Sequence, residues 1–199
     1  MLIWINGAFG SGKTQTAHEL QRRVETAHVA DPELLGYALH KMLPAYERND
    51  FQDIPQWRSG VGDVLQQAEG AARGPVIVPM TIVRDDYFDE IVGGLRERGV
   101  DIRHYTLSAT PEALRKRLRS RLSTLRGHED TWALSNIDRC VSALNEARYA
   151  THVPTDDLTI DEVVEWIAED AGLPLVTERM RPARYQLRRL GVGIRHIRL

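Results

Sequence analysis

The segment that most constrains this chain is the run 7–14, Gly7-Ala8-Phe9-Gly10-Ser11-Gly12-Lys13-Thr14. It matches the pattern GxxxxGK(S/T) in full, with a hydrophobic stretch typical of a strand before it and an amphipathic helical pattern after it. Glycines let such a loop turn tightly and point several N–H groups at a phosphate, and the helix N-terminus adds positive potential. The pattern predicts that Lys13 reaches the β- and γ-phosphates of ATP and that the Thr14 hydroxyl ligates Mg²⁺.

Strand-like and helix-like patterns alternate along the chain, which predicts βαβ units and a parallel sheet covered on both faces. We expect strands at 2–6, 27–30, 75–83, 102–107 and 152–154, and helices at 13–25, 34–43, 56–72, 84–98, 110–122, 130–148 and 160–171. These patterns predict a doubly wound α/β fold with a parallel sheet of about five strands. Trp4 and Trp166 are expected in the core, and Cys140 is interpreted as a buried apolar residue rather than a reactive thiol.

Charge divides the chain into two parts. The net charge of −2 separates into −8 for residues 1–174, the predicted α/β domain, and +6 for residues 175–199, a basic tail. Read as a helix, residues 182–199 place an apolar stripe beside an arginine face, a pattern typical of a helix on an anionic membrane surface. Packing on the domain or on a second subunit, as a homodimer, explains the stripe equally well.

Other features bound the location and the partners. No stretch approaches the roughly 20 apolar residues that span a bilayer. The N-terminus lacks a basic region ahead of its apolar run, so it does not read as a signal peptide. A single cysteine suits a reducing compartment. These features predict a cytoplasmic protein, or a peripheral one on the inner face of the cell membrane. Aromatic residues are too sparse in the tail for a nucleic-acid partner to be expected.

Acidic residues follow the second expected strand as Asp31-Pro32-Glu33, and none follows the third. The carboxyl ends of parallel strands line the ligand crevice of an open α/β sheet. A carboxylate there can accept the proton of a substrate hydroxyl or hold a metal ion. We therefore take Asp31 as the candidate base and metal ligand, with Glu33 sharing these duties. The alternative is that Asp31 only caps the next helix.

Two further groups of residues are candidates for the site. Arg117 and Arg121 lie four residues apart on one helix face and could neutralise a transferred phosphoryl group, although a solvated basic face is the usual fate of such a run. For an acceptor molecule the candidates are Trp57 and Arg58 at a helix start, with Met80 and Thr81 after the third strand. For Trp57, burial in the core is an equally good explanation.

Several segments together resemble the bacterial tunicamycin-resistance protein family. They are the opening run 3–17 around the glycine loop, Asp31-Pro32-Glu33, Asp50-Phe51-Gln52 with Trp57-Arg58, the run 77–83 (IVPMTIV), the run 137–141 (IDRCV) and the closing His196-Ile197-Arg198. The likeness extends nearly from end to end, and the runs 77–83 and 137–141 are more specific than the glycine loop.

This resemblance implies an ATP-binding protein of P-loop kinase-like fold that protects a bacterium from tunicamycin, a nucleoside–sugar compound with a fatty-acyl chain and many hydroxyls. Two mechanisms would give resistance: phosphorylation of a drug hydroxyl with ATP and Mg²⁺, or tight binding of the drug at the membrane surface without phosphoryl transfer. A third interpretation is a kinase of an ordinary small metabolite.

Overall fold

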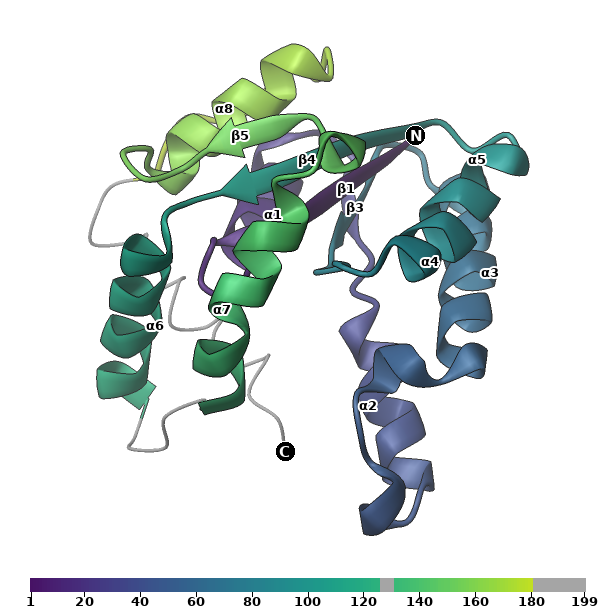
Figure 1. Cartoon of the computed structure of the whole chain (residues 1–199). Helices are drawn as coiled ribbons and strands as arrows, with labels where there is room; N and C mark the ends of the chain where they lie inside the picture. Colours follow the sequence, from purple (N-terminus) through teal and green to yellow (C-terminus); the bar gives the residue numbers. More distant parts are fainter. Residues whose placement is uncertain (126–130, 181–199) are drawn as a thin grey trace.

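The computed structural model describes residues 1–125 and 131–180, with the backbone alone at 121–125. Its centre is a five-stranded sheet in the order β2-β3-β1-β4-β5, and every pair of neighbouring strands is parallel. Helices cover both faces of this sheet (Figure 1). The chain builds one side of the sheet with β2 and β3 and then crosses β1 to build the other with β4 and β5. This reversal creates a crevice at the carboxyl end of β1. The predicted doubly wound α/β fold is confirmed.

The elements follow the expected order along the described chain. The strands are β1 (Leu2–Gly7), β2 (His28–Val29), β3 (Val76–Pro79), β4 (Ile102–Ser108) and β5 (His152–Pro154). The α-helices are α1 (Lys13–Arg23), α2 (Glu33–Met42), α3 (Pro55–Ala71), α4 (Asp85–Phe88), α5 (Gly94–Glu97), α6 (Pro111–Leu125), α7 (Thr131–Leu144) and α8 (Ile160–Asp170). Short turns of 3-10 helix are η1 (Ala45–Glu47), η2 (Phe51–Asp53) and η4 (Ala147–Tyr149), and a π-helical turn, η3 (Asp89–Gly93), joins α4 to α5.

Strand β1 is buried along its whole length because its side chains alternate between two cores. Ile3 and Ile5 pack with the inner faces of α1 and α8. Leu2 and Trp4 lie on the other face, in a core with α3 and the helix formed by α4, η3 and α5. A third cluster joins α6 and α7 to the glycine loop through Ala8. The glycine loop therefore follows the central strand of the sheet, which is buried along its whole length.

Strand β3 ends at Pro79, four residues earlier than predicted. The reason is Asn6, whose side chain takes the place of a neighbouring strand. Its amide accepts a hydrogen bond from the Ile82 N–H (3.1 Å) and donates one to the Ile82 carbonyl (2.9 Å). The same amide oxygen accepts from the N–H of Gly7 at 2.8 Å. Asn6 thereby pulls residues 80–83 across the carboxyl end of β1 and fixes them against the start of the glycine loop.

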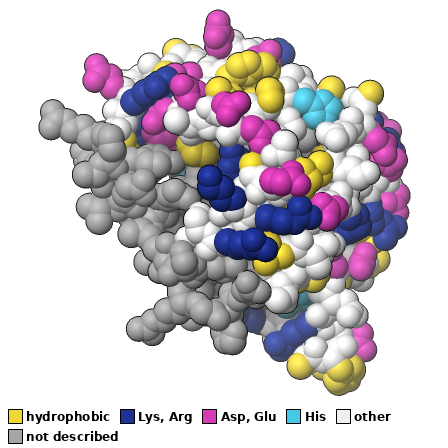
Figure 2. All heavy atoms as spheres, turned by 60° about the vertical axis from the view of Figure 1, so that its left-hand side comes forward, with side chains coloured by type: hydrophobic (Ala, Val, Ile, Leu, Met, Phe, Trp, Pro, Cys, Tyr) yellow, Lys and Arg dark blue, Asp and Glu magenta, His cyan; other side chains and the backbone are white. Residues whose placement is uncertain are grey.

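The described surface mixes charges of both signs. On the face in Figure 2, Lys and Arg side chains lie among Asp and Glu side chains. Arg115 of α6 pairs with Asp138 of α7 at 2.6 Å, and Arg98 pairs with Asp63 at 2.8 Å. In the described part of the chain, no helix has both the length and the apolar character to cross a membrane.

Two predictions about the periphery have different outcomes. Trp166 was expected in the core, but the structure leaves it 37% exposed because Val163, Val164 and Ile167 occupy the inner face of α8. The predicted amphipathic helix at 182–199 lies outside the described residues. The described start of the basic tail contacts the domain: the N–H of Val176 donates to the carbonyl of Arg23 at 2.7 Å.

Candidate nucleotide and acceptor site

The glycine loop has the backbone geometry of a phosphate cradle. Gly7, Gly10 and Gly12 have φ angles of +146°, +84° and +99°, in the region that favours glycine. The outer side of the loop is closely packed. A Cβ at Gly10 would lie 3.0 Å from the side chain of Leu118, and one at Gly12 would lie 2.9 Å from Ile160. Helix α1 begins directly after Gly12, so its N-terminal N–H groups complete the cradle.

Lys13 is held at the mouth of this loop. Its ammonium donates to the carbonyl oxygens of Gly7 (2.9 Å) and Ala8 (3.1 Å) and lies 5.8 Å from the centre of the Phe9 ring. Its charge also acts on both sides of the crevice. It lowers the pKa values of Asp31, beyond β2, and of Cys140, on α7, against the larger opposing effect of burial. Lys13 is thus close enough to both Asp31 and Cys140 for its charge to act on them.

Asp31 lies at the carboxyl end of β2, where the sequence predicted a base. Burial raises its pKa from 3.8 to about 7, and repulsion from the carboxylate of Glu33 contributes to this rise. The N–H of Glu33 donates to one Asp31 oxygen at 2.9 Å, which lowers the pKa but does not cancel the increase. This contact is the capping role that the sequence left open. A carboxyl group that titrates near neutrality beside Lys13 is suited to receive a proton.

Trp57 supports the turn that carries Asp31. Its side chain is fully buried in the core below α2 and α3, and its indole N–H donates to the carbonyl of Pro32 at 3.0 Å. The structure therefore gives Trp57 the core position that was the alternative to acceptor contact. The physical reason is that a large apolar side chain at the first turn of α3 faces the sheet, and its one polar atom finds a backbone partner.

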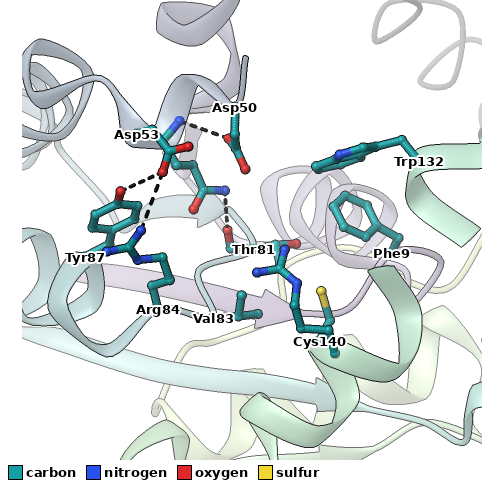
Figure 3. Close-up of a pocket in the computed structure, with 11 residues that line it drawn as sticks. Phe9, Asp50, Asp53, Thr81, Val83, Arg84, Tyr87, Trp132 and Cys140 are labelled. Atoms are coloured by element: carbon teal, nitrogen blue, oxygen red, sulfur yellow. Dashed lines mark hydrogen bonds and ion pairs between the residues drawn. The ribbon is translucent and has the colours of Figure 1, made fainter. Parts of the chain in front are cut away.

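A cavity of about 260 Å³ opens beside the glycine loop. Its walls come from segments far apart in the sequence: the loop itself, residues 50–53, the segment after β3, α4 and α7 (Figure 3). The residues that line it are Phe9, Asp50, Gln52, Asp53, Thr81, Val83, Arg84, Tyr87, Trp132, Arg139 and Cys140. Because Phe9 belongs to both the loop and the cavity, a molecule in the cavity would lie next to the phosphate cradle.

Of the other predicted acceptor residues, Thr81 lines the cavity and Arg58 and Met80 do not. Met80 is buried in the core beneath it, because its side chain points to the inner face of the sheet. Arg58 braces the wall from behind: it pairs with Glu90 at 2.5 Å, donates to the Gln52 carbonyl at 2.7 Å and stacks on Tyr87. Neither side chain lines the cavity, and direct contact of either one with an acceptor stays a prediction.

Thr81 ties the cavity to the loop. Its hydroxyl donates to the carbonyl of Gly7 at 2.8 Å, the same oxygen that receives the Lys13 ammonium. Its own carbonyl accepts a hydrogen bond from the Gln52 side chain at 3.0 Å. A short chain of hydrogen bonds therefore connects the wall at residues 50–53 to the phosphate cradle.

The predicted cations on α6 have separate outcomes. The guanidinium of Arg117 donates to the carbonyl of Thr155 and, at 3.2 Å, to the Thr155 hydroxyl. It therefore holds the loop after β5, and contact with a phosphoryl group would require it to leave these partners. Arg121 belongs to α6, and its side chain lies outside the described residues. A role for either one in phosphoryl transfer stays a prediction.

Glu33 is the first residue of α2, and its carboxylate accepts a hydrogen bond from the Tyr37 hydroxyl at 2.7 Å. Its charge is one of the two causes that raise the pKa of Asp31. The structure thus gives Glu33 an electrostatic influence on the candidate base, which the sequence did not predict.

Sequence reasoning missed most of the cavity wall. Asp50, Arg139 and Cys140 lie within segments that carry the family resemblance, and that resemblance was the signal that could have selected them. Trp132 had no signal, because its contact with Phe9 joins residues more than 120 positions apart, with ring centroids 4.9 Å apart. Such pairings exist only once the chain is folded.

The fold and the loop together define a P-loop nucleotide-binding protein of kinase-like architecture. A family model described as AAA domain matches residues 2–146. No functionally curated protein matches the sequence. Two kinase structures share the fold: a gluconokinase from Sinorhizobium meliloti (17% identity, 85% of this chain and 90% of that one, TM-score 0.60) and a shikimate kinase from Bacteroides thetaiotaomicron (18%, 87% and 99%, TM-score 0.56).

The structure of a tunicamycin resistance protein from Deinococcus radiodurans is more similar in sequence than these two. It has 33% identity over 89% of this chain and 99% of that one, with a TM-score of 0.74. This chain belongs to the bacterial tunicamycin-resistance protein family.

Proposed function

We propose that this protein is an ATP- and Mg²⁺-dependent phosphotransferase that acts on a hydroxyl of tunicamycin or a related nucleoside-like compound. The observation that carries the proposal is the position of Asp31: a carboxyl group with a pKa of about 7 lies within electrostatic reach of the P-loop lysine. A nucleotide-binding protein that only held its ligands would need the cradle but no group able to take a proton near neutral pH.

The reaction follows from these groups. Lys13 exchanges its loop carbonyls for the β- and γ-phosphate oxygens of ATP, which the loop N–H groups also bind. Ionised Asp31 accepts the proton of the acceptor hydroxyl as the hydroxyl oxygen bonds to the γ-phosphorus. The bond between that phosphorus and the β–γ bridging oxygen breaks, and ADP leaves. The products are ADP and a phosphate monoester of the acceptor.

The residues present fit a magnesium ion. The Thr14 hydroxyl and the Asp31 carboxylate offer the hard oxygen donors that Mg²⁺ prefers. Mg²⁺ would supply charge neutralisation between the β- and γ-phosphates. Asp31 can serve as metal ligand or as base, and Glu33 is the neighbouring carboxylate for the other duty.

Tunicamycin is proposed as the acceptor because a relative with 33% identity is a tunicamycin resistance protein. The test is to incubate the protein with tunicamycin, ATP and Mg²⁺ and to measure the mass of the drug. We expect a gain of one phosphate that depends on the wild-type protein and is lost with Lys13→Ala and with Asp31→Asn. An unmodified drug that nevertheless binds the protein would refute transfer and favour sequestration.

A further inference from the structure

The cavity beside the P-loop has the size of a single ring, which restricts what the acceptor places there. Sites for drug-sized molecules enclose roughly 300–1,000 Å³, and this cavity encloses about 260 Å³. A compound with several rings and an acyl chain would therefore insert one ring and leave the rest outside. The polar and aromatic groups of the wall determine which ring enters.

One wall offers an aromatic surface. Phe9 and Trp132 meet edge to face, and both line the cavity (Figure 3). Trp132 is 42% exposed although its ring contacts Phe9. A partly exposed indole at the edge of a polar cavity suits the C–H face of a ring whose rim carries hydroxyls.

Two of the four charged residues in the wall already have partners there. The Asp53 carboxylate accepts from the Tyr87 hydroxyl at 2.6 Å and lies 3.7 Å from Arg84. Arg84 also pairs with Asp86 at 2.5 Å and lies 4.0 Å from the centre of the Tyr87 ring. These groups stabilise one another within the wall. Little of their hydrogen-bonding capacity is left for a ligand.

Asp50 and Arg139 keep most of their hydrogen-bonding capacity for a ligand. Among the described residues, the Asp50 carboxylate accepts one hydrogen bond, from the N–H of Gln52 at 3.0 Å, and Arg139 donates one, to the Asn136 side chain at 3.1 Å. Asp50 and Cys140, the neighbour of Arg139, lie on opposite sides of the cavity (Figure 3). An acceptor and a set of donors on opposite walls match hydroxyl groups, each of which donates and accepts.

We infer that Asp50 and Arg139 select a hydroxyl-bearing sugar ring, which packs against Trp132 and presents a hydroxyl to the nucleotide. This inference rests on the proposed function, because a phosphoryl acceptor must carry a hydroxyl. A nucleobase has none, so the base of a nucleoside-like compound lies outside the cavity. Asp50 and Arg139 are thus specificity-determining residues, distinct from Asp31.

The first test measures binding of tunicamycin and transfer kinetics in Asp50→Asn and Arg139→Lys. Asparagine keeps the oxygen that caps Gln52 and removes the charge, and lysine keeps the charge and removes the planar fork. We expect Kd and KM to rise roughly 10- to 100-fold in each, the effect of losing a hydrogen bond to a charged group, with kcat changed less than about threefold. ATP affinity should stay unchanged. Unchanged Kd in both variants would overturn the inference.

Matched controls separate the cavity from the fold. Asp63→Asn, at an exposed carboxylate paired with Arg98 on the outer side of α3, should leave Kd and KM unchanged. Trp132→Ala should weaken tunicamycin binding about tenfold. Trp166→Ala, at a similarly exposed indole on α8, should have no effect.

The second test uses fragments and needs no catalysis. Tryptophan fluorescence is followed while N-acetylglucosamine, uridine or uracil is added, and the Trp132 signal is taken as the difference between the wild type and Trp132→Phe, because Trp4, Trp57 and Trp166 also emit. We expect a change with the two hydroxyl-bearing compounds that Asp50→Asn abolishes, and none with uracil. A response to uracil equal to that of uridine, or no response to either sugar compound, would overturn the inference. If sugars bind in this way but tunicamycin is never phosphorylated, the proposed function fails while the ring selection holds.

Discussion

Asparagine in place of Asp31 should make the protein more stable and inactive at the same time. The folded protein raises the pKa of this carboxyl from 3.8 to about 7. Between about pH 4 and pH 7 the folded state therefore binds more protons at Asp31 than the unfolded state does, and the free energy of unfolding falls as the pH rises. Above pH 7 the native protein carries the full cost of an ionised Asp31. An asparagine side chain has no charge to ionise, so the variant avoids that cost.

The magnitude follows from the change in pKa. One pKa unit corresponds to about 1.4 kcal/mol, and the rise from 3.8 to about 7 gives an upper bound of ~4 kcal/mol. Because Asp31 is partly exposed, solvent screening reduces this to ~2 kcal/mol. For a chain of this length, that difference raises the melting temperature by about 4–8 °C. The amide oxygen of asparagine can still accept from the Glu33 N–H, so the cap is retained.

The assay is urea denaturation of wild type and Asp31→Asn at about pH 4 and about pH 8, without nucleotide or metal. The variant should be more stable at the higher pH and nearly equal at the lower one. Asp63→Asn serves as the control and should show less than about 0.5 kcal/mol at either pH. Equal stabilisation by Asp31→Asn at both pH values would refute the reasoning, because the effect would then not arise from ionisation.

Three other substitutions test separate parts of the site. Lys13→Ala should lower ATP affinity at least about 100-fold and abolish transfer while circular dichroism stays native. The reason is that the ammonium binds loop carbonyls and that the side chain lies outside the hydrophobic clusters of the described chain. Calorimetric titration of ATP checks the affinity, and an unfolded variant would contradict the prediction. Trp57→Phe should reduce stability by about 1–3 kcal/mol, since it leaves the buried Pro32 carbonyl without its donor, and should lower kcat by displacing the turn at Asp31. Asn6→Ala should destabilise by about 3 kcal/mol or more, because it orphans backbone groups of both Gly7 and Ile82; a loss under about 1 kcal/mol in thermal unfolding would show that the amide does not bridge them.

The fold was accessible from the sequence because its signals are local. A buried strand, a glycine loop and an amphipathic helix follow one another within 25 residues, and the same alternation continues to α8. Expected boundaries held to within about two residues for most elements. Two ends were misjudged by four residues: α7 ends at Leu144 instead of 148, and β3 ends at Pro79 instead of 83. At β3, the side chain of Asn6 acts as a strand partner for Ile82 from 76 positions away. Hydropathy patterns carry no trace of such a contact.

The two halves of the candidate site differ in how well the sequence predicts them. Lys13 and Asp31 could be selected as candidates because each follows a strand, and parallel strands bring their carboxyl ends to one edge. The wall of the cavity beside the loop could not be predicted, because it joins α7 to residues 50–53 and to the segment after β3. Trp57 shows the difference most plainly. Its residue type fits a ligand platform and a core equally well, and only its depth below Pro32 decides between them.

The sequence by itself determined that this chain binds a nucleotide phosphate on a parallel α/β sheet, since loop, lysine and flanking periodicity depend on neighbouring residues. It also predicted that a carboxylate, Asp31, follows the second strand at the same edge of the sheet as the glycine loop. Tertiary structure alone decided the pKa of that carboxylate, because burial and the nearby Glu33 and Lys13 charges set it. It also decided which charged side chains of the cavity wall have hydrogen-bonding groups that other residues do not already use. Both are properties of the distances between residues, and those distances come into being only when the chain is folded.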